Sequence, residues 1–398
     1  MAEEVWMLQT KKADFKQIGA RFRIDPVTAR IIRNRGIEGE AAIDRYLNGT
    51  LDDLYDPMLL KDMERAVSIL CEAVDTGKKI RIVGDYDIDG VCSTYILLQA
   101  FERLGSDVDF EIPDRIKDGY GINESIIEQA HADGVEVILT CDNGISAFHQ
   151  VELAKKYGMT VVITDHHEVP LDGEKEKIPP ADAVIDPKQA DCPYPFPEIC
   201  GAVVAYKLVQ VLYARRGVPQ MEWLDLLEFA AIATVGDVMK LQDENRILVK
   251  YGLKKMAQTK NLGLRRLAEK NNLDLGAITA YHIGFVIGPC LNAGGRLKTA
   301  KEALALLRAQ SEEEAERLAE ELKELNDTRK DMTEQGTEAA KLQVESWYQK
   351  DKVLVVFLPE CHESLAGIIA GRLREYYQKP AIVLTRGEEA VKGSGRSI

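Results

Sequence analysis

Short apolar segments alternate with amphipathic segments over residues 79–185 of the chain. The apolar segments are rich in β-branched residues and have the length of strands, whereas the amphipathic segments repeat apolar residues at helical spacing. We therefore predict strands over 79–83, 108–112, 135–140, 160–164 and 183–185, and helices over 91–104, 124–132 and 146–157. This alternation predicts an α/β fold built on a doubly wound, mostly parallel sheet.

Helical spacing dominates the rest of the chain. We predict a helix over 63–74 and, beyond the sheet, helices over 202–214, 223–235, 246–257 and 262–270. Residues 284–297 are too rich in glycine for an ordinary helix, and we expect their backbone to approach a ligand closely. Residues 299–347 predict one long, charged connector helix, and a strand, a helix and a strand follow over 352–358, 364–377 and 381–384.

These patterns divide the chain into parts. We expect a helical leader over 1–55, a domain over 56–300 with a helical subregion at about 200–297, a connector helix over 301–348 and a smaller α/β domain over 349–398. One helix with two or three strands is too little to close a core. We therefore expect the chain to be a C-terminally truncated fragment of a longer protein.

Acidic or imidazole side chains follow all five predicted strands. The residues concerned are Asp85, Asp87 and Asp89 after the first strand, Asp114 after the second, Asp142 after the third, Asp165, His166 and His167 after the fourth, and Asp186 after the fifth. Asp237, just past an apolar helix, adds a further carboxylate. One such aspartate is usually a helix cap, and the Asp-His-His alone also fits a capped turn with two solvated histidines. Because parallel strands end at one edge of a sheet, the repetition favours a site.

Carboxylates and imidazoles without thiolates favour manganese or magnesium over structural zinc. Two such cations could be held together, with Asp142 shared between them, to activate a water and stabilise the leaving oxygen of a phosphodiester. Donors suited to phosphate oxygens are Arg115, Asn292, Arg296, Ser394 and Arg396. The sequence has neither a P-loop nor a glycine-rich dinucleotide-binding motif, which disfavours both of those functions.

The overall charge changes this picture little. A net charge of −14 argues against a protein coated in positive charge for nucleic acid, although a basic groove can coexist with an acidic exterior.

The acidic start at residues 1–4 lacks the features of a secretion signal, and no apolar run approaches the length of a membrane span. The seven cysteines are scattered, as reduced thiols are. We expect a cytoplasmic protein without membrane contact.

Five segments, in order, resemble the motifs of the DHH phosphoesterase superfamily and, within it, of the RecJ family of bacterial exonucleases. They are Gly84-Asp85-Tyr86-Asp87-Ile88-Asp89-Gly90, Asp142-Asn143-Gly144, Asp165-His166-His167, Ala233-Thr234-Val235-Gly236-Asp237 and Gly288-Pro289-Cys290-Leu291-Asn292-Ala293-Gly294-Gly295-Arg296. Residues 362–373 resemble the start of the DHH-associated domain. One departure is Cys290, which stands where the family pattern often has arginine and affects one expected phosphate contact.

The resemblance implies a nuclease that uses manganese or magnesium to degrade single-stranded DNA from its 5′ end to mononucleotides, in recombination and DNA repair. It also implies a monomer that works with single-strand-binding protein and a helicase. The positions that match metal ligands are Asp87, Asp89, Asp142, His166 and Asp237, with Asp85 as a ligand or a support. By the same resemblance His167 would contact the scissile phosphate, Asp165 would orient the histidines, and Arg115, Arg296 and Arg396 would bind phosphates.

Two other functions compete with this one. A small-substrate member of the superfamily, an oligoribonuclease or cyclic-dinucleotide phosphodiesterase, would share the metal ligands, but the leader, the helical subregion and the long connector favour RecJ. A non-catalytic DNA-binding scaffold would be expected to have lost carboxylates, and this sequence has all of them.

Overall fold

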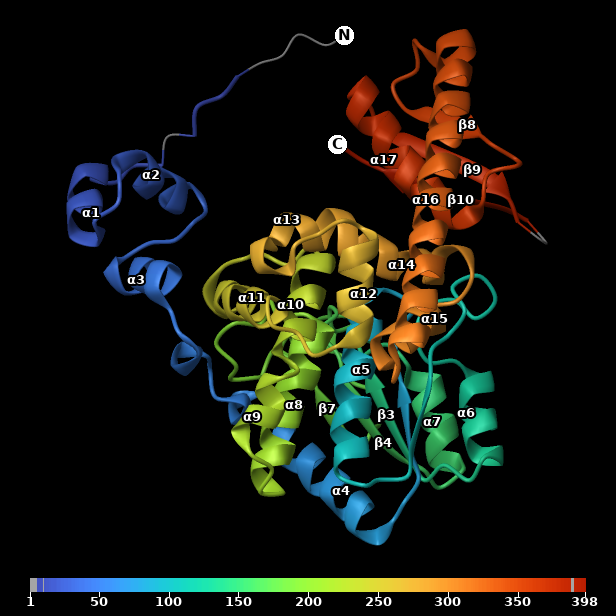
Figure 1. The fold of residues 1–398 in the computed structure, drawn as a ribbon. Helices are drawn as coiled ribbons and strands as arrows, with labels where there is room; N and C mark the ends of the chain where they lie inside the picture. Colours follow the sequence, from blue (N-terminus) through green and yellow to red (C-terminus); the bar gives the residue numbers. More distant parts are fainter. Residues whose placement is uncertain (1–5, 10, 388–389) are drawn as a thin grey trace.

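A parallel sheet of five strands lies at the centre of the larger domain in the computed structural model, which describes residues 6–9, 11–387 and 390–398 (Figure 1). The strand order is β2-β1-β3-β4-β7, and every pairing is parallel. The strands are β1 (Ile80–Val83), β2 (Val108–Glu111), β3 (Val137–Cys141), β4 (Thr160–Thr164) and β7 (Ala183–Ile185). The predicted fold class is confirmed.

Both faces of this sheet are buried, which explains the uninterrupted apolar character of its strands. Ile82 and Leu139 belong to a large core, whereas their neighbours Val83 and Ile138 belong to a smaller core on the opposite face. The large core includes residues of α4 (Met63–Thr76), α5 (Ile88–Arg103), α8 (Gly201–Arg215) and α10 (Leu227–Gly236). The smaller core includes residues of α6 (Glu124–Ala132) and α7 (Phe148–Lys156). Strands covered on both faces are the rule for parallel sheets.

Between residues 200 and 270 the helical subregion follows the prediction except over 223–235. That stretch forms two helices, α9 (Gln220–Leu224) and α10, because the chain turns at Asp225 and Leu226. The next two helices are those predicted over 246–257 and 262–270, α11 (Asp243–Met256) and α12 (Leu262–Lys270).

The glycine-rich segment 284–297 is helical, so the prediction that its glycines exclude an ordinary helix is wrong over Gly288–Leu297. A π-helical turn (Ile283–Ile287) continues α13 (Ala280–His282) and leads into α14 (Gly288–Leu297). The glycines serve close packing within the protein: a Cβ on Gly295 would lie 2.3 Å from the carbonyl oxygen of Tyr86. Tertiary packing therefore outweighs the low helix propensity of glycine here.

The connector is two helices and not one, contrary to the prediction. α15 (Lys301–Arg308) ends before residue 309, and α16 (Glu312–Gln343) starts after Ser311, whose side chain accepts a hydrogen bond from the amide of Glu314. A serine followed by acidic residues is a helix-start signal that the charged pattern obscured. Figure 1 shows α16 rising from the larger domain to a smaller C-terminal unit.

The C-terminal unit contains the predicted strand, helix and strand, and one strand more. β8 (Leu354–Phe357) and β9 (Ala381–Arg386) pair in parallel beside α17 (Ala366–Tyr377). The strand that we did not predict, β10 (Val391–Arg396), pairs antiparallel with β9.

The leader forms three helices that lie apart from the sheet in Figure 1. They are α1 (Phe15–Phe22), α2 (Pro26–Asn34) and α3 (Glu40–Asn48), and they share a small apolar cluster. Residues 1–5 and 10, which include the acidic start, lie outside the described residues. Within the described part of the chain, no helix combines the length and apolarity needed to cross a membrane.

Glu228 on α10 predicts a pH-dependent contribution to stability. Burial raises the pKa of its carboxyl from 4.5 to about 7, so the folded protein keeps a proton that the unfolded chain loses. The stabilisation is complete below pH 4.5 and is lost as the pH rises through 7. We expect Glu228→Gln to raise the free energy of unfolding by up to about 3 kcal/mol at pH 8 and to change it little at pH 4.5. Urea unfolding at the two pH values measures this, and a variant less stable at pH 8 would contradict it.

Candidate metal centre at the carboxyl end of the sheet

The strand order places a ligand site between β1 and β3. From β1 the chain proceeds outward to β2 on one side, whereas β3, β4 and β7 extend on the other side. Ligands of open parallel sheets bind where the order reverses, beyond the carboxyl ends of the strands. The residues after β1 and β3 are the predicted metal ligands Asp85, Asp87, Asp89 and Asp142.

The turn after β1 holds three carboxylates. Asp87 is the N-cap of α5, and its side chain accepts hydrogen bonds from the amides of Asp89 and Gly90 at 2.9 and 3.1 Å. Asp89, in the first turn of α5, accepts from the amides of Gly201 and Ala202 at 2.7 Å each. The start of α8 thus donates to Asp89, and these bonds hold its carboxylate in a buried position.

Asp142 lies directly after β3 and is only 2% exposed. Its φ of 62° is in the left-handed region, which aspartate and asparagine adopt more readily than most residues. Gly201 has to be glycine at this place, because a Cβ there would lie 2.7 Å from the Cβ of Asp142.

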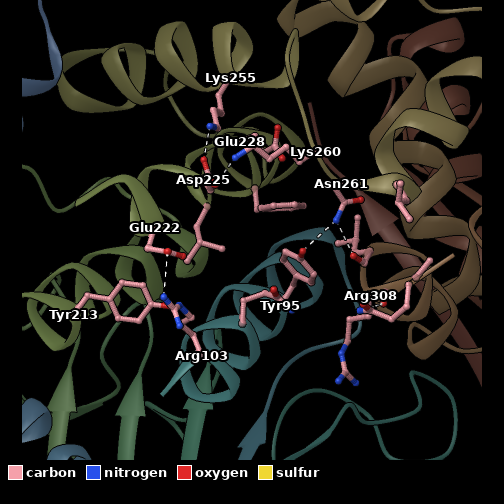
Figure 2. Close-up of a pocket in the computed structure, with 17 residues that line it drawn as sticks. Tyr95, Arg103, Tyr213, Glu222, Asp225, Glu228, Lys255, Lys260, Asn261 and Arg308 are labelled. Atoms are coloured by element: carbon pink, nitrogen blue, oxygen red, sulfur yellow. Dashed lines mark hydrogen bonds and ion pairs between the residues drawn. The ribbon is translucent and has the colours of Figure 1, made fainter. Parts of the chain in front are cut away.

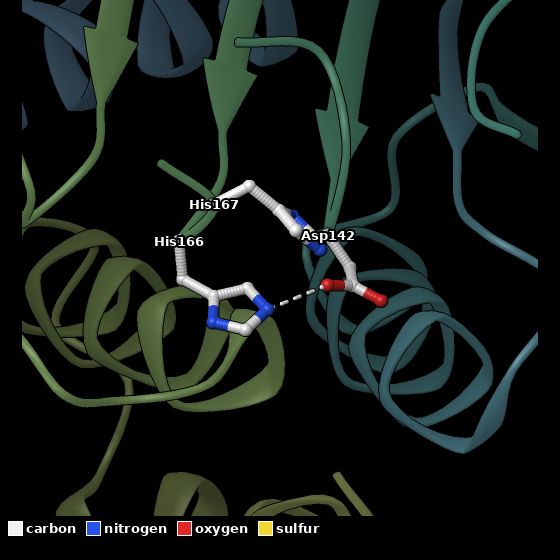
Figure 3. Close-up of side chains that lie close together, drawn as sticks. All are labelled: Asp142, His166 and His167. Carbon is white, nitrogen blue, oxygen red and sulfur yellow. Dashed lines mark ion pairs between the residues drawn. The ribbon is translucent and has the colours of Figure 1, made fainter. Parts of the chain in front are cut away.

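His166 connects the carboxylates of different elements. Its Nε2 lies 3.0 Å from Oδ1 of Asp142, 3.3 Å from Oδ2 of Asp89 and 3.8 Å from Oδ2 of Asp237. Asp237 reaches this place because it is the C-cap of α10. Figure 3 shows the His166 ring directed at Asp142, with His167 beside the same carboxylate.

Asp165 holds the second histidine. Its Oδ1 lies 2.7 Å from Nδ1 of His167, and its Oδ2 accepts a hydrogen bond from the amide of Ile145 at 2.9 Å. The Tyr120 hydroxyl donates to the carbonyl oxygen of Asp142 at 2.7 Å and lies 3.0 Å from Nδ1 of His167. The side chain of His167 stays 43% exposed, so it can reach a bound substrate.

Three overlapping groups of side chains bring their potential ligand atoms within 4.8 Å of one another. The groups are Asp85, Asp87 and Asp142; Asp89, His166 and Asp237; and Asp142, His166 and His167. They include all six predicted metal ligands. Asp142 and His166 each belong to two groups, which is the arrangement that two neighbouring cations with a shared ligand require.

The charge of this cluster fits cations. Oδ2 of Asp85 is buried without a hydrogen-bond partner among the described residues, and Oδ1 of Asp142 is buried with the Nε2 of His166, 3.0 Å away, as its neighbour. Burial, and then Asp89, raises the pKa of Asp142 well above its usual range, whereas burial and Asp87 raise that of Asp85 to about 7. Burial and Asp89 likewise raise the pKa of Asp237 to about 7. Buried carboxylates that repel one another are stabilised by hard divalent cations with oxygen and imidazole ligands.

The two histidines differ in charge. Burial lowers the pKa of His166 despite the nearby Asp89, which keeps its imidazole neutral, as a metal ligand must be. Burial opposes protonation of His167 too, but the hydrogen bond and charge of Asp165 outweigh it and raise the pKa to about 9. His167 is therefore a cation suited to a phosphate oxygen. The same contact lowers the pKa of Asp165, although burial alone would raise it.

Besides Asp165, which holds His167, two of the aspartates that follow strands are not in these groups. Asp114 accepts hydrogen bonds from the amides of Ile116 and Lys117, so it is a turn cap. Asp186 is buried and accepts from the amide of Lys188, and burial, followed by the charge of Asp165, raises its pKa to about 7. We expected all five strands to contribute to the site. The ligand groups instead come from the ends of three strands, β1, β3 and β4, and from the end of α10.

A basic cavity of about 410 Å³ collects most of the predicted phosphate donors. Its lining includes Arg115, Arg296, Ser394 and Arg396, and also Lys392. The guanidinium of Arg115 stacks over the ring of Tyr86 at 3.9 Å. In the sequence, Tyr86 lies between Asp85 and Asp87, two of the candidate metal ligands. Burial, followed by repulsion from Arg115 and Arg329, lowers the pKa of Arg296 to about 10, so this site has an excess of positive charge.

Two residues of the glycine-rich motif lie elsewhere. Asn292 is half-buried on α14 and does not line the basic cavity. Cys290 is fully buried, with its Sγ 3.8 Å from Oδ1 of Asn271. Cys290 is therefore not among the residues that line the basic cavity.

Sequence reasoning missed two polar contributors. Tyr120 joins Asp142 to His167, and Lys392 lines the basic cavity, where it pairs with Glu363 at 2.9 Å. Tyr120 stands between Gly119 and Gly121, and this glycine pair was the available signal for a loop that folds over the site.

Comparison with known proteins gives consistent matches. The model of the DHH family, N-terminal domain, matches residues 79–234. The single-stranded-DNA-specific exonuclease RecJ of Bacillus subtilis is 37% identical over 99% of this chain and 49% of its own length. That of Haemophilus influenzae is 35% identical over 96% of this chain and 67% of its own length. The chain thus spans about half the length of the first relative and about two thirds of the second.

Solved structures of two RecJ exonucleases are also similar to this chain. RecJ from Thermus thermophilus in complex with Mn²⁺ has a TM-score of 0.80 and 30% identity, covering 96% of this chain and 53% of that one. The exonuclease RecJ bound to manganese has a TM-score of 0.74 and 33% identity, covering 85% of this chain and 83% of that one.

Proposed function

Because this chain belongs to the RecJ family, within the DHH family, we propose that it is a metal-dependent exonuclease. It would hydrolyse phosphodiester bonds of single-stranded DNA from the 5′ end to mononucleotides, in recombination and DNA repair. The observation that carries the proposal is the cluster around Asp142 and His166 beside a basic cavity. The solved relatives bind manganese and magnesium, which supports the same cations here.

Each residue of the cluster has a role in this reaction. Asp85, Asp87 and Asp142 would hold one cation, and Asp89, His166, Asp237 and the shared Asp142 the other. When bound, two divalent cations supply an activated water and neutralise charge on the scissile phosphate. His167, held by Asp165 and Tyr120, donates a hydrogen bond to a phosphate oxygen.

The basic cavity explains recognition of an end. Arg115, Arg296 and Arg396 come from the larger domain and from β10, so the terminal phosphate would be held between the two parts of the chain. A strand that enters with its 5′ phosphate in this cavity places its first phosphodiester bond near the metal cluster. Such an arrangement favours removal of one nucleotide at a time.

Product analysis tests the proposal. With Mn²⁺ and 5′-phosphorylated single strands of graded length, we expect mononucleotides to be released stepwise from the 5′ end of long strands, and duplex of the same sequence to resist. Cleavage confined to di- and trinucleotides would instead support the small-substrate phosphodiesterases. Binding of single strands without any cleavage would support the scaffold function.

Arg396→Ala should raise KM for a 5′-phosphorylated strand by about tenfold to a hundredfold, because it removes a charge-assisted hydrogen bond. KM for a strand with a 5′ hydroxyl should change little. Steady-state kinetics on the two substrates measures the difference. Arg386→Ala is the matched control, since Arg386 is exposed on the neighbouring strand and does not line the cavity. Equal effects on both substrates would contradict the assignment of the 5′ phosphate to this cavity.

Further properties stay predictions. We expect a monomer located in the cytoplasm that works with single-strand-binding protein and a helicase. Sedimentation of the isolated chain measures whether it is a monomer. Co-sedimentation with single-strand-binding protein on DNA measures whether the two proteins work together.

A further inference from the structure

The helical leader concentrates positive charge in a protein that is acidic as a whole. Residues 11–35 contain eight lysines and arginines against two aspartates, which gives this segment a net charge of +6 in a chain whose net charge is −14. Both aspartates, Asp14 and Asp25, cap the N-termini of α1 and α2, where their side chains accept backbone hydrogen bonds. Such a basic segment on an acidic protein indicates an anionic partner.

Most of these cations have no acidic partner within the protein. In the described part of the chain, ion pairs are formed only by Arg21, with Glu40 at 3.3 Å, and by Arg33, with Glu38 at 2.7 Å. All of the others are exposed except Arg30, which is half-buried. They are Lys11, Lys12, Lys16, Arg23, Arg30 and Arg35. Their charge is therefore available to a partner in solution.

Three of these cations line one open hollow, which we call the leader hollow. Lys12 precedes α1, Lys16 lies in its first turn and Arg30 comes from α2, and the volume of the hollow is about 720 Å³. The guanidinium of Arg30 lies 4.5 Å from the centre of the Phe15 ring, which holds the guanidinium in place. The acid in the lining is Asp14, which is already engaged as the cap of α1. The leader hollow thus has an excess of positive charge.

The cavity between α5 and α10 has the opposite character (Figure 2). Arg103 is directed at Glu222, 3.3 Å away, and Lys255 is directed at Asp225. The positive charges of that cavity are therefore compensated by acids of the protein, whereas those of the leader hollow are not.

The leader is attached to the segment that follows a candidate metal ligand. Nε2 of Gln242 donates to the carbonyl oxygen of Arg35 at 2.7 Å, and Nε of Arg45 lies 3.3 Å from Oδ1 of Asp243. Gln242 follows Asp237 by five residues, so their Cα atoms lie within about 18 Å of one another. Figure 1 shows the leader helices on one side of α13 and the C-terminal unit, which contributes to the basic cavity, on the other side.

We propose that the leader binds the phosphate backbone of single-stranded DNA downstream of the metal centre, with Lys12, Lys16 and Arg30 in contact with its phosphates. The inference rests on the proposed function, because that function supplies the strand: its 5′ end lies in the basic cavity, and its remainder continues past the metal centre to the leader. Backbone contacts carry no sequence information, so the leader raises the affinity for long strands of any sequence.

Fluorescence anisotropy of the full chain with a labelled oligo-dT strand of about 30 nucleotides, in EDTA and between about 50 and 200 mM NaCl, tests the proposal. Each phosphate contact on a single strand contributes about 0.7 to the slope of log K against log salt concentration. The triple variant Lys12→Gln, Lys16→Gln and Arg30→Gln should therefore reduce the slope by about 2 and weaken binding at the lowest salt about tenfold or more.

Two further variants make this result specific. Lys12→Gln with Lys16→Gln leaves Arg30 on the Phe15 ring, so it preserves the packing of α1 on α2 and should reduce the slope by about 1.4. The matched control changes three exposed lysines outside the leader and alters the net charge equally, so it should leave the slope unchanged. It combines Lys156→Gln, Lys260→Gln and Lys350→Gln.

Three results would overturn the proposal: no binding of the strand by the wild-type chain, an unchanged slope in both leader variants, or an equal loss in the control. A leader that binds an acidic peptide of another protein would give the unchanged slope. Because binding is measured without metal, failure of the leader variants to weaken it leaves the nuclease proposal intact. Binding that depends on the leader in a chain that cleaves no DNA would instead overturn the nuclease proposal alone.

Discussion

Asp142→Asn is expected to lower kcat for hydrolysis of 5′-phosphorylated single-stranded DNA by about 10³-fold or more at saturating Mn²⁺. Asp142 belongs to two of the three ligand groups and lies 3.0 Å from Nε2 of His166, so no other carboxylate can replace it. Asparagine is the suitable replacement because the φ of 62° favours it over alanine. Initial rates of mononucleotide release measure the loss.

The same variant should be more stable than the wild-type chain in EDTA. The substitution removes a carboxyl whose ionised form is disfavoured by burial and by the charges of Asp89 and Asp87, so the melting temperature of the variant without metal should rise while its activity disappears. Asp172→Asn, on an exposed strand, is the matched control and should change neither property. Retention of wild-type cleavage in Asp142→Asn would refute the role of Asp142 as shared ligand.

His167→Ala is expected to lower kcat by about 10²- to 10³-fold, with little change in the affinity for Mn²⁺. The imidazole is held by Asp165 at 2.7 Å and stays partly exposed, so its loss removes a positioned donor to the phosphate. Single-turnover rates with Mn²⁺ titrations at fixed DNA separate the two effects.

His149→Ala provides the control for His167→Ala, because His149 is exposed and belongs to none of the three ligand groups. It should leave both the rate and the Mn²⁺ affinity unchanged. A His167 variant whose rate recovers fully at high Mn²⁺ would contradict the phosphate contact and make His167 a metal ligand.

The metal cluster was predictable because topology alone brings its residues together. Once parallel strands are recognised, Asp87, Asp142 and His166 must end at one edge of the sheet, whatever the loop details. Asp114 was overestimated because sequence position does not distinguish a carboxylate that faces the sheet edge from one that caps its own turn.

The features that could not be predicted from the sequence depend on contacts between distant segments of the chain. Gly295 sits in a helix because α14 packs against the carbonyl of Tyr86, and no local pattern encodes that neighbour. β10 exists through its pairing with β9, although its glycines disfavour a strand. Tyr120 joins the site through a loop that has no periodic pattern, and Glu228 becomes an unpaired acceptor only through the packing of α10.

The number of Mn²⁺ ions bound per chain, with their magnetic coupling by electron paramagnetic resonance, tests the central claim most directly. Two ions that share Asp142 should give a spin-coupled pair in the wild-type chain, and Asp142→Asn should lose the coupling. A single uncoupled ion in the wild-type chain, or a coupled pair that persists in Asp142→Asn, would contradict a two-metal centre built around Asp142.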